Sequence, residues 1–94
     1  MRIDEFIWLP DIAEKLAFKH SVTPEEVEEL FFNQPRIRFH EKGHVQGEDM
    51  YTALGQTDSG RYLIVFFIFK PSRRVLIISA REMEPTERRR HARK

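Results

Sequence analysis

Arg74-Val75-Leu76-Ile77-Ile78-Ser79-Ala80-Arg81 is the stretch that decides the fold of this 94-residue chain. Its apolar run predicts a buried strand that ends in a small polar pair and a cation. A basic helix is expected to follow, over residues 84–94. A strand that carries an arginine to the end of a sheet, beside a positively charged helix, is a way to place cations against phosphates.

Three further strands are expected before this one. Residues 62–69 are apolar throughout and predict a central strand with both faces covered. Residues 48–56 form the preceding strand, which reaches it through the tight turn Thr57-Asp58-Ser59-Gly60. Residues 36–40 alternate in the manner of a half-buried strand. The alternation sets two apolar residues against three polar ones: Ile37 and Phe39 against Arg36, Arg38 and His40.

A short strand and two helices are expected at the beginning of the chain. Residues 3–8 fit the strand, and Pro10 fits the first turn of a helix that runs to about Lys19. A second helix begins after Thr23, a good N-cap, and Glu26 lies three residues later, as in a capping box. The first helix has one apolar stripe: Leu9, Ile12, Ala13, Leu16 and Ala17. The second has a hydrophobic staple: Val22 and Val27.

The order of elements is a short N-terminal strand, two helices, a four-stranded sheet and a C-terminal helix. The short hairpin connections predict a mostly antiparallel sheet with the first two helices on one face, which is an α+β fold. A chain of 94 residues makes one domain, residues 1–94, without room for a second core. One C-terminal helix is too small to cover the whole face of the sheet opposite the first two helices. A partner protein could cover the rest of that face.

Composition excludes several classes of function. There is no cysteine, so the chain has no disulfide scaffold, zinc–thiolate site or thiol nucleophile. No apolar run approaches the roughly 20 residues of a membrane span. The first residues include acids where a secretory signal carries cations. We therefore expect a cytoplasmic protein with no membrane contact and no cofactor.

The net charge of +1 hides an uneven distribution. Four glutamates lie in residues 25–29. The C-terminus instead gathers cations: Arg88, Arg89, Arg90, Arg93 and Lys94. This asymmetry indicates either a cationic face for an anionic partner or an ordinary helix end, where cations also interact favourably with the helix dipole.

Motifs for metal or nucleophilic chemistry are weak. His40, Glu41 and His44 have the His-Glu-x-x-His spacing of zinc proteases, which works only on a helix. Here a strand precedes the motif and Gly43 falls inside it, so we expect a loop and no metal. The serines lack the glycine pattern of a nucleophile elbow, and the glycines are dispersed in turns rather than gathered in a phosphate loop.

Cations are the remaining candidates for a site. Lys19 and His20 close the first helix, Arg61 opens the central strand and Arg81 ends the last one. Each has a structural alternative: helix capping for the first two, solvation for Arg61, and pairing with Glu82 or Glu84 for Arg81. Because arginine forks suit phosphate oxygens, we expect Arg61 and Arg81 to converge on one anion pocket at the end of the sheet.

Three blocks of the sequence resemble, in order, the BrnT family of small bacterial toxins: Lys19-His20-Ser21-Val22-Thr23-Pro24-Glu25-Glu26-Val27 with Phe31, Gly55 through Gly60-Arg61-Tyr62-Leu63, and Ile77-Ile78-Ser79-Ala80-Arg81 followed by Glu87-Arg88. The resemblance implies a RelE-like fold, ribonuclease activity and neutralisation by a BrnA-like antitoxin, a ribbon-helix-helix protein. It also implies that operator DNA is bound only through the toxin–antitoxin complex. The chain departs from the family at Leu9, Ile12 and Leu16, three positions that are commonly polar there, and at Ser21, which replaces a glycine.

Cleavage of RNA would use the ribose 2′-hydroxyl, which attacks the adjacent phosphorus while the protein supplies orientation and positive charge. His20 is the expected acid–base residue, because imidazole titrates near neutrality. Arg61 and Arg81 are the expected phosphate clamps. RNA binding is expected of three further cations: Lys19, Arg88 and Arg89.

The alternative function is that of a catalytically weak or inactive member of the same fold that acts as a protein-binding module. The apolar residues Leu9, Ile12 and Leu16 favour this interpretation. In that case the apolar sheet face would hold an antitoxin-like peptide or a second copy of the chain, as a homodimer.

Overall fold

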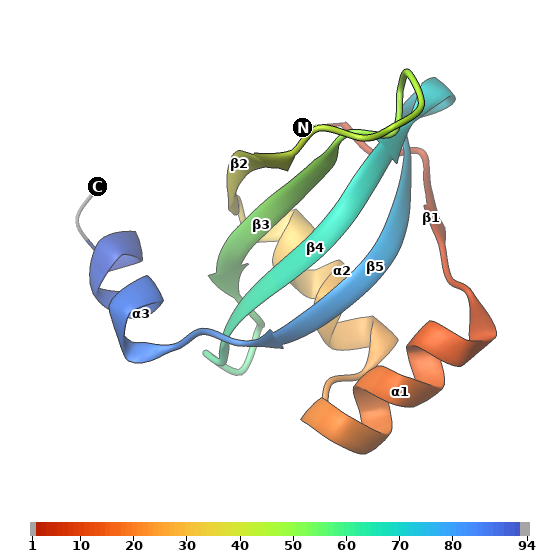
Figure 1. Ribbon diagram of the computed structural model, residues 1–94. Coiled ribbons are helices and arrows are strands. Elements are labelled where there is room, and N and C mark those ends of the chain that lie inside the picture. The colour runs from red at the N-terminus through yellow and green to blue at the C-terminus, as the bar shows by residue number, and fades with distance from the viewer. Residues whose placement is uncertain (1, 93–94) are drawn as a thin grey trace.

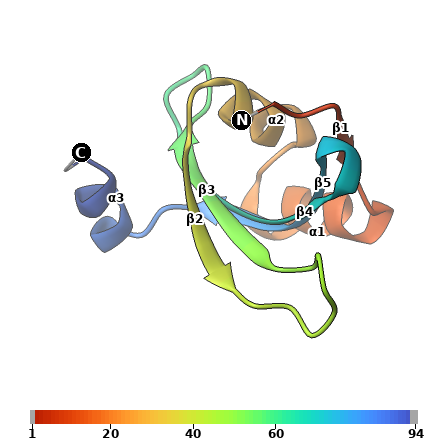
Figure 2. The same ribbon diagram turned by 90° about the horizontal axis from the view of Figure 1, so that it is seen from above.

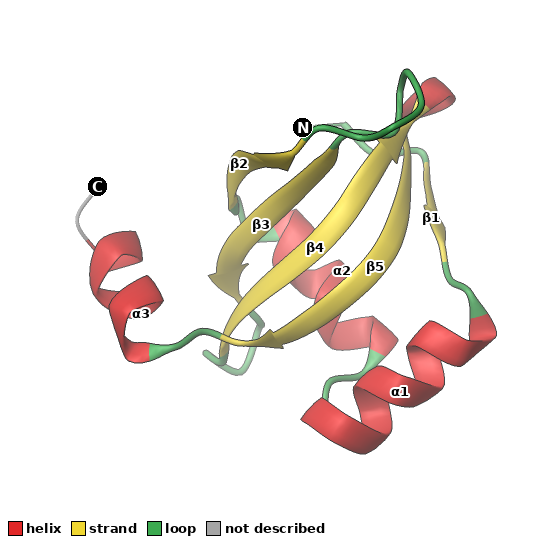
Figure 3. Cartoon of the chain, viewed as in Figure 1, coloured by secondary structure: helices red, strands yellow, loops and turns green. Residues whose placement is uncertain are grey.

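The computed structural model describes residues 2–92, which form a five-stranded sheet with helices beside it (Figures 1 and 3). The strands lie in the order β1-β5-β4-β3-β2. The last two residues of the helix expected over 84–94 lie outside the described part. The elements are β1 (Glu5–Ile7), α1 (Pro10–His20), α2 (Pro24–Phe32), β2 (Arg36–Glu41), β3 (Met50–Gln56), β4 (Tyr62–Lys70), the 3₁₀ turn η1 (Pro71–Arg73), β5 (Arg74–Glu82) and α3 (Pro85–Ala92).

The α+β class is confirmed, but the sheet has five strands rather than the predicted four. The short N-terminal strand β1 joins it by pairing in parallel with the first part of β5, so that Glu5 lies opposite Arg74 and Ile7 opposite Leu76. The Asp4 amide extends this contact with a hydrogen bond of 2.8 Å to the Arg73 carbonyl. A parallel neighbour so far along the chain leaves no turn signal between the two strands, so the local pattern could not reveal it.

Helix α2 begins as its sequence predicts. The Glu26 amide donates to the Thr23 hydroxyl at 3.1 Å, and the Thr23 amide donates back to the Glu26 carboxylate. This reciprocal capping box satisfies two amides that a helix start leaves free. The staple residues Val22 and Val27 are both fully buried. Helix α1 ends at Ser21, which has a left-handed backbone with φ of 53°.

The main core lies between the sheet and the helices α1 and α2 (Figure 2). Alternate residues of β4 point into it, and Phe31 of α2 meets Phe67 edge-to-face with ring centroids 5.2 Å apart. We call this side of the sheet the helix face. Its largest fully buried side chains are Leu16, Val22, Val27, Leu30, Leu63, Val65, Phe67, Val75 and Ile77.

The other side of the sheet, which we call the open face, has only a small apolar cluster. Leu54, Ile64 and Met83 are buried there, with Tyr62 and Phe66 packed against them. Helix α3 buries none of its residues and stands away from α1 and α2, at the end of the sheet where β5 finishes (Figure 1). The prediction that both faces of β4 are covered is therefore met only in part. No helix within residues 2–92 is both long and apolar enough to cross a membrane.

Candidate functional site

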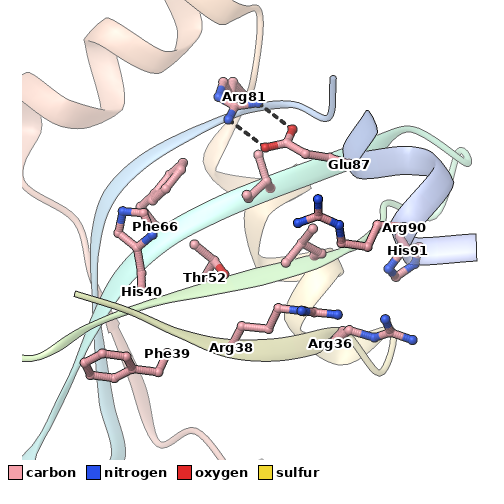
Figure 4. A pocket seen from close by; sticks show the side chains of 12 residues that line it. Arg36, Arg38, Phe39, His40, Thr52, Phe66, Arg81, Glu87, Arg90 and His91 are labelled. Carbon is pink, nitrogen blue, oxygen red and sulfur yellow. Dashed lines mark hydrogen bonds and ion pairs between the residues drawn. The ribbon is translucent and has the colours of Figure 1, made fainter. Parts of the chain in front are cut away.

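A cation-rich cavity of about 260 Å³ lies between the open face and α3 (Figure 4). We call it the basic pocket. It draws side chains from β2, β3, β4, β5 and α3. Its lining residues are Arg36, Arg38, Phe39, His40, Thr52, Leu54, Ile64, Phe66, Arg81, Glu87, Arg90 and His91.

Strand β2 supplies one rim of the basic pocket. Ile37 packs against the main core, so the alternation of the strand turns Arg36 and Arg38 to the open face. Neither guanidinium is paired with a carboxylate in the described part of the chain. His40 lies at a β-bulge, and its ring meets that of Phe66 at 5.2 Å between centroids. This rim therefore presents unneutralised positive charge beside an aromatic surface.

Arg81 lies on the opposite rim, at the end of β5. Both terminal nitrogens of its guanidinium donate to the Glu87 carboxylate of α3, at 2.8 and 2.9 Å. This forked bond raises the pKa of Arg81 and lowers that of Glu87, although partial burial opposes both shifts. The Arg81 guanidinium also lies 5.8 Å from the centre of the Phe66 ring. In the described chain Arg81 thus forms its ion pair with Glu87 rather than with Glu82 or Glu84, the two partners expected from the sequence.

Arg61 makes a different set of contacts, on the helix face. Its guanidinium donates to the carbonyls of Ser21 at 2.7 Å and His20 at 3.2 Å, and to both carboxylate oxygens of Glu26 at 3.0 Å. A further bond of 3.0 Å reaches Glu82 on β5. The hydrogen bond to Glu82 raises the pKa of Arg61, against the opposing effect of burial. Burial also acts to raise the pKa of Glu26, but bonds from Thr23 and Arg61 outweigh it and lower the pKa. Arg61 thereby ties the connection between α1 and α2 to the sheet.

The expectation that Arg61 and Arg81 share one anion pocket is not met. Both lie at the same end of the sheet, since Leu63 pairs with Glu82 and Ile64 with Arg81. They point to opposite faces because Arg61 contacts the helix connection while Arg81 stands beside Ile64 on the open face. The alternation of strand residues decides this, and it depends on where each strand begins.

The remaining predicted residues also divide between regions. Lys19 is exposed and His20 half-buried, both in the last turn of α1, and the His20 carbonyl is held by Arg61. Arg88 stacks on the Tyr62 ring at 4.2 Å and lines a small pocket together with Arg61. Arg89 is exposed on α3. The C-terminal cations thus lie near the open face, whereas the helix α1 residues do not line the basic pocket.

The sequence reasoning missed the contribution of β2 to the site. The signal was present, because the alternation of residues 36–40 places three cationic or ionisable side chains on one face. By itself, however, such alternation predicts only a half-buried strand. Arg90 was noted as part of a charged helix end and not as a site residue. The predicted site therefore lacked four residues: Arg36, Arg38, His40 and Arg90.

Metal-ligating side chains do not gather into a cluster in the described chain. No group of three or more metal-ligating side chains occurs within residues 2–92. The His-Glu-x-x-His spacing begins in strand β2 and continues into the following loop, as expected, so its two histidines do not share a helix face.

The fold and the site together define a small α+β protein with a cation-rich sheet face suited to an anionic ligand. The family described as ribonuclease toxin, BrnT, of type II toxin–antitoxin system matches residues 8–87. The chain belongs to this family. Membership makes it a toxin of a toxin–antitoxin system, with an antitoxin as its partner. A comparison with the curated proteins finds no match.

Proposed function

We propose that this chain is a RelE-like ribonuclease toxin that binds and cuts single-stranded RNA in the basic pocket. One observation carries the proposal: four guanidinium groups surround a cavity to which one carboxylate, Glu87, also contributes. RNA is the polyanion on which a ribonuclease toxin acts, and phosphate contacts supply much of the affinity of such complexes. The single domain expected over residues 1–94 is part of the same proposal.

The reaction needs few groups from the protein. The 2′-hydroxyl oxygen attacks the adjacent phosphorus, the bond to the 5′ oxygen breaks, and a cyclic phosphate and a free 5′-hydroxyl result. The hydroxyl proton goes to a base and the leaving oxygen takes a proton from an acid. Negative charge grows on the phosphate oxygens in the transition state, where fixed cations stabilise it.

Arg81 is the proposed phosphate clamp. Its fork already binds two carboxylate oxygens of Glu87, which are arranged like two oxygens of a phosphate. The incoming phosphate would take the place of this carboxylate, so α3 would have to release Arg81. Arg36, Arg38 and Arg90 would then hold the neighbouring phosphates.

Two histidines are proposed for the acid–base step. His20 remains a candidate for this step, although it does not line the basic pocket. His40 does line the pocket, on the rim opposite Arg81. Comparing His20→Ala with His40→Ala in a cleavage assay identifies which one acts, because only the acid–base residue should flatten the pH profile of cleavage.

For Arg61 we propose a structural role outside the chemistry, because its donors are directed at protein acceptors on the helix face. By fixing the carbonyl of His20 it would orient the end of α1. The exposed cations would attract RNA over longer range, in a salt-dependent way. These are Lys19, Arg88 and Arg89.

The partner proposed for the chain is a BrnA-like antitoxin of the ribbon-helix-helix class. Operator DNA would be bound only through the complex of the two proteins, and the location would be the cytoplasm. A homodimer is a further proposal. Pull-down with a small ribbon-helix-helix protein from a neighbouring gene, followed by size measurement, checks the partner and the dimer together.

The binding-module alternative has one observation in its favour. Both arginines expected to hold phosphate are paired with carboxylates, Arg61 with Glu26 and Glu82, and Arg81 with Glu87. The apolar residues Leu9, Ile12 and Leu16 give this alternative little support. Leu16 is 2% exposed and Ile12 packs on the core, so that Leu9 is the exposed member of the three.

Cleavage of end-labelled single-stranded RNA by the purified chain, with a chelator present, tests the proposal. We expect a cyclic-phosphate product without added metal, and a loss of about a hundredfold in rate for Arg81→Ala. Arg2→Ala is the matched control, because it removes the same charge from a side chain that is 76% exposed. An intact RNA, or an Arg81→Ala variant as active as the control, would remove the catalytic role of the basic pocket.

A further inference from the structure

The pairing of the strands arranges the open face in rows. In one row, Leu54 and Ile64 lie side by side between two arginines. In the next, Thr52 and Phe66 continue from a third arginine. Since neighbouring strands lie about 4.8 Å apart, each row presents a floor of uncharged side chains beside cations. The rows are Arg36-Leu54-Ile64-Arg81 and Arg38-Thr52-Phe66.

The floor of the basic pocket is apolar and aromatic. Leu54 and Ile64 are 8% and 6% exposed, and Phe66 is half-buried beside them. The rings of Phe66 and His40 meet at an angle of 75°. Such a floor does not bind phosphates, because phosphates interact with cations and hydrogen-bond donors. The floor therefore points to a second part of the ligand that is flat and apolar on its faces.

Thr52 adds one polar group to this floor. The residue is 6% exposed, and Figure 4 shows it in the middle of the side chains that line the basic pocket. Its hydroxyl is not among the buried polar atoms left without a partner in the described part of the chain, so it stays within reach of solvent or a neighbour. A hydroxyl on the floor of the pocket can donate to, or accept from, polar groups on the edge of a ligand.

We propose that the basic pocket is a nucleobase subsite, in which one base of single-stranded RNA lies against Ile64 and Phe66 and hydrogen-bonds with Thr52. The flanking phosphates contact the arginines of the two rims. This inference rests on the proposed function and deepens it, because it names the part of the RNA that the pocket holds. Stacking of bases on aromatic side chains, next to cations that follow the backbone, is how proteins bind unpaired strands.

The chemistry favours a base over an aromatic side chain of a partner protein. Both have an apolar face, but a base also carries donors and acceptors along its edge, within reach of a hydroxyl. Four arginines around the cavity fit the phosphates on either side of a nucleotide. A base paired in a duplex has both faces stacked and its edge engaged, so the subsite selects unpaired strands.

Fluorescence anisotropy with the full chain tests the subsite. The probe is a short single-stranded 2′-O-methyl RNA, which cannot undergo 2′-hydroxyl attack, and its partner is the same strand with abasic nucleotides. We expect the abasic strand to bind about tenfold or more weakly, the loss typical of one stacked base. Equal affinity of the two strands, or binding of neither, overturns the inference.

Two variants locate the base. Phe66→Leu keeps an apolar floor but removes the aromatic face, and should weaken binding of the intact strand about tenfold while leaving the abasic strand unchanged. Thr52→Val removes the hydroxyl at constant shape and should reduce the difference in affinity among strands of different base. Phe18→Leu is the control, because Phe18 is 89% exposed on α1. Variants that bind both strands as the unaltered chain does place the base elsewhere and overturn the inference.

The outcomes separate this inference from the proposed function. Base-dependent binding without any cleavage of ordinary RNA supports the subsite and contradicts the nuclease. Cleavage together with base-independent binding does the reverse. If Phe66→Leu fails to fold, as judged by its thermal unfolding, the comparison of intact and abasic strands on the unaltered chain still decides.

Discussion

The two faces of this sheet use arginine in different ways. On the helix face, Arg61 bonds to two backbone carbonyls and two glutamates that come from separate elements, so its guanidinium joins parts of the fold. On the open face, Arg81 is held by one carboxylate of a helix that buries none of its residues. The first arrangement cannot release its arginine without loosening the structure. In our proposal the second can exchange its acceptor for a phosphate, so that the helix face serves stability and the open face binds RNA.

Core substitutions should show the largest difference between the faces. Leu63→Ala, on the helix face, removes a fully buried side chain and should lower the free energy of unfolding by about 3 kcal/mol. Leu54→Ala, in the small cluster of the open face, should cost about half as much, because solvent reaches the site more easily. Urea unfolding measures both. Equal losses would mean that the open face is as much a core as the other, and would argue against an accessible surface there.

Removing Arg61 should destabilise the fold rather than the chemistry. Arg61→Ala leaves Glu26, half-buried at the start of α2, without its partner, and should cost roughly 1–2 kcal/mol because the group is partly screened by solvent. The melting temperature should fall by several degrees while cleavage per folded molecule stays within about twofold. Arg61→Lys should recover only part of the loss, since an ammonium cannot make the fork. A stable but inactive Arg61→Ala variant would instead make Arg61 a catalytic residue.

Ser21 tests the junction that Arg61 holds. Its φ of 53° is one that glycine adopts without cost, and glycine is the residue that the family resemblance leads one to expect there. Ser21→Gly should therefore stabilise the chain by about 0.5–1 kcal/mol in urea unfolding. The control Ser79→Gly makes the same change inside strand β5 and should destabilise by a similar amount. If Ser21→Gly did not stabilise the chain, the left-handed backbone at this junction would carry no strain.

The pH dependence of stability should be the smallest effect. The forked bond from Arg81 lowers the pKa of Glu87 below its ordinary value of 4.5. A depressed carboxylate stabilises the fold above its unfolded pKa, and this contribution is lost as the pH falls through its folded pKa. The unaltered chain should thus exceed Glu87→Gln in stability by less than about 1 kcal/mol at pH 7, and this difference should shrink as the pH falls below 4.5. An advantage that persists in acid would assign the effect to packing.

Glu87→Gln should also bind RNA more tightly at pH 7, because it frees Arg81.

Much of the helix face could be predicted because its signals are local. The capping box of Thr23 and Glu26 and the staple around it identify the start of α2 from a few neighbouring residues. The all-apolar β4 indicates a central strand in the same way. The place of β1 could not be predicted, because its parallel neighbour β5 comes at the other end of the fold and no turn chemistry connects them.

The site was harder to predict than the fold. Arg81 was chosen from its place at the end of a strand, and it does line the basic pocket. The same reasoning applies to Arg61, but a side chain at the end of a strand can point to either face of the sheet. The sequence near Gly60 does not show to which face Arg61 points. Arg36 and Arg38 line the pocket because their side chains point to the face of the sheet beside which α3 lies. This is a tertiary relation that no short sequence pattern contains.

Amide chemical-shift changes on adding the uncleavable 2′-O-methyl RNA test the central claim most directly, because they identify the RNA-binding surface of the protein residue by residue. We predict shifts around Arg38, Thr52, Phe66 and Arg81, with little change in α1 and α2. The largest shifts at Lys19, His20 and Arg61, with a silent open face, would contradict the account and return the site to the helix side of the sheet.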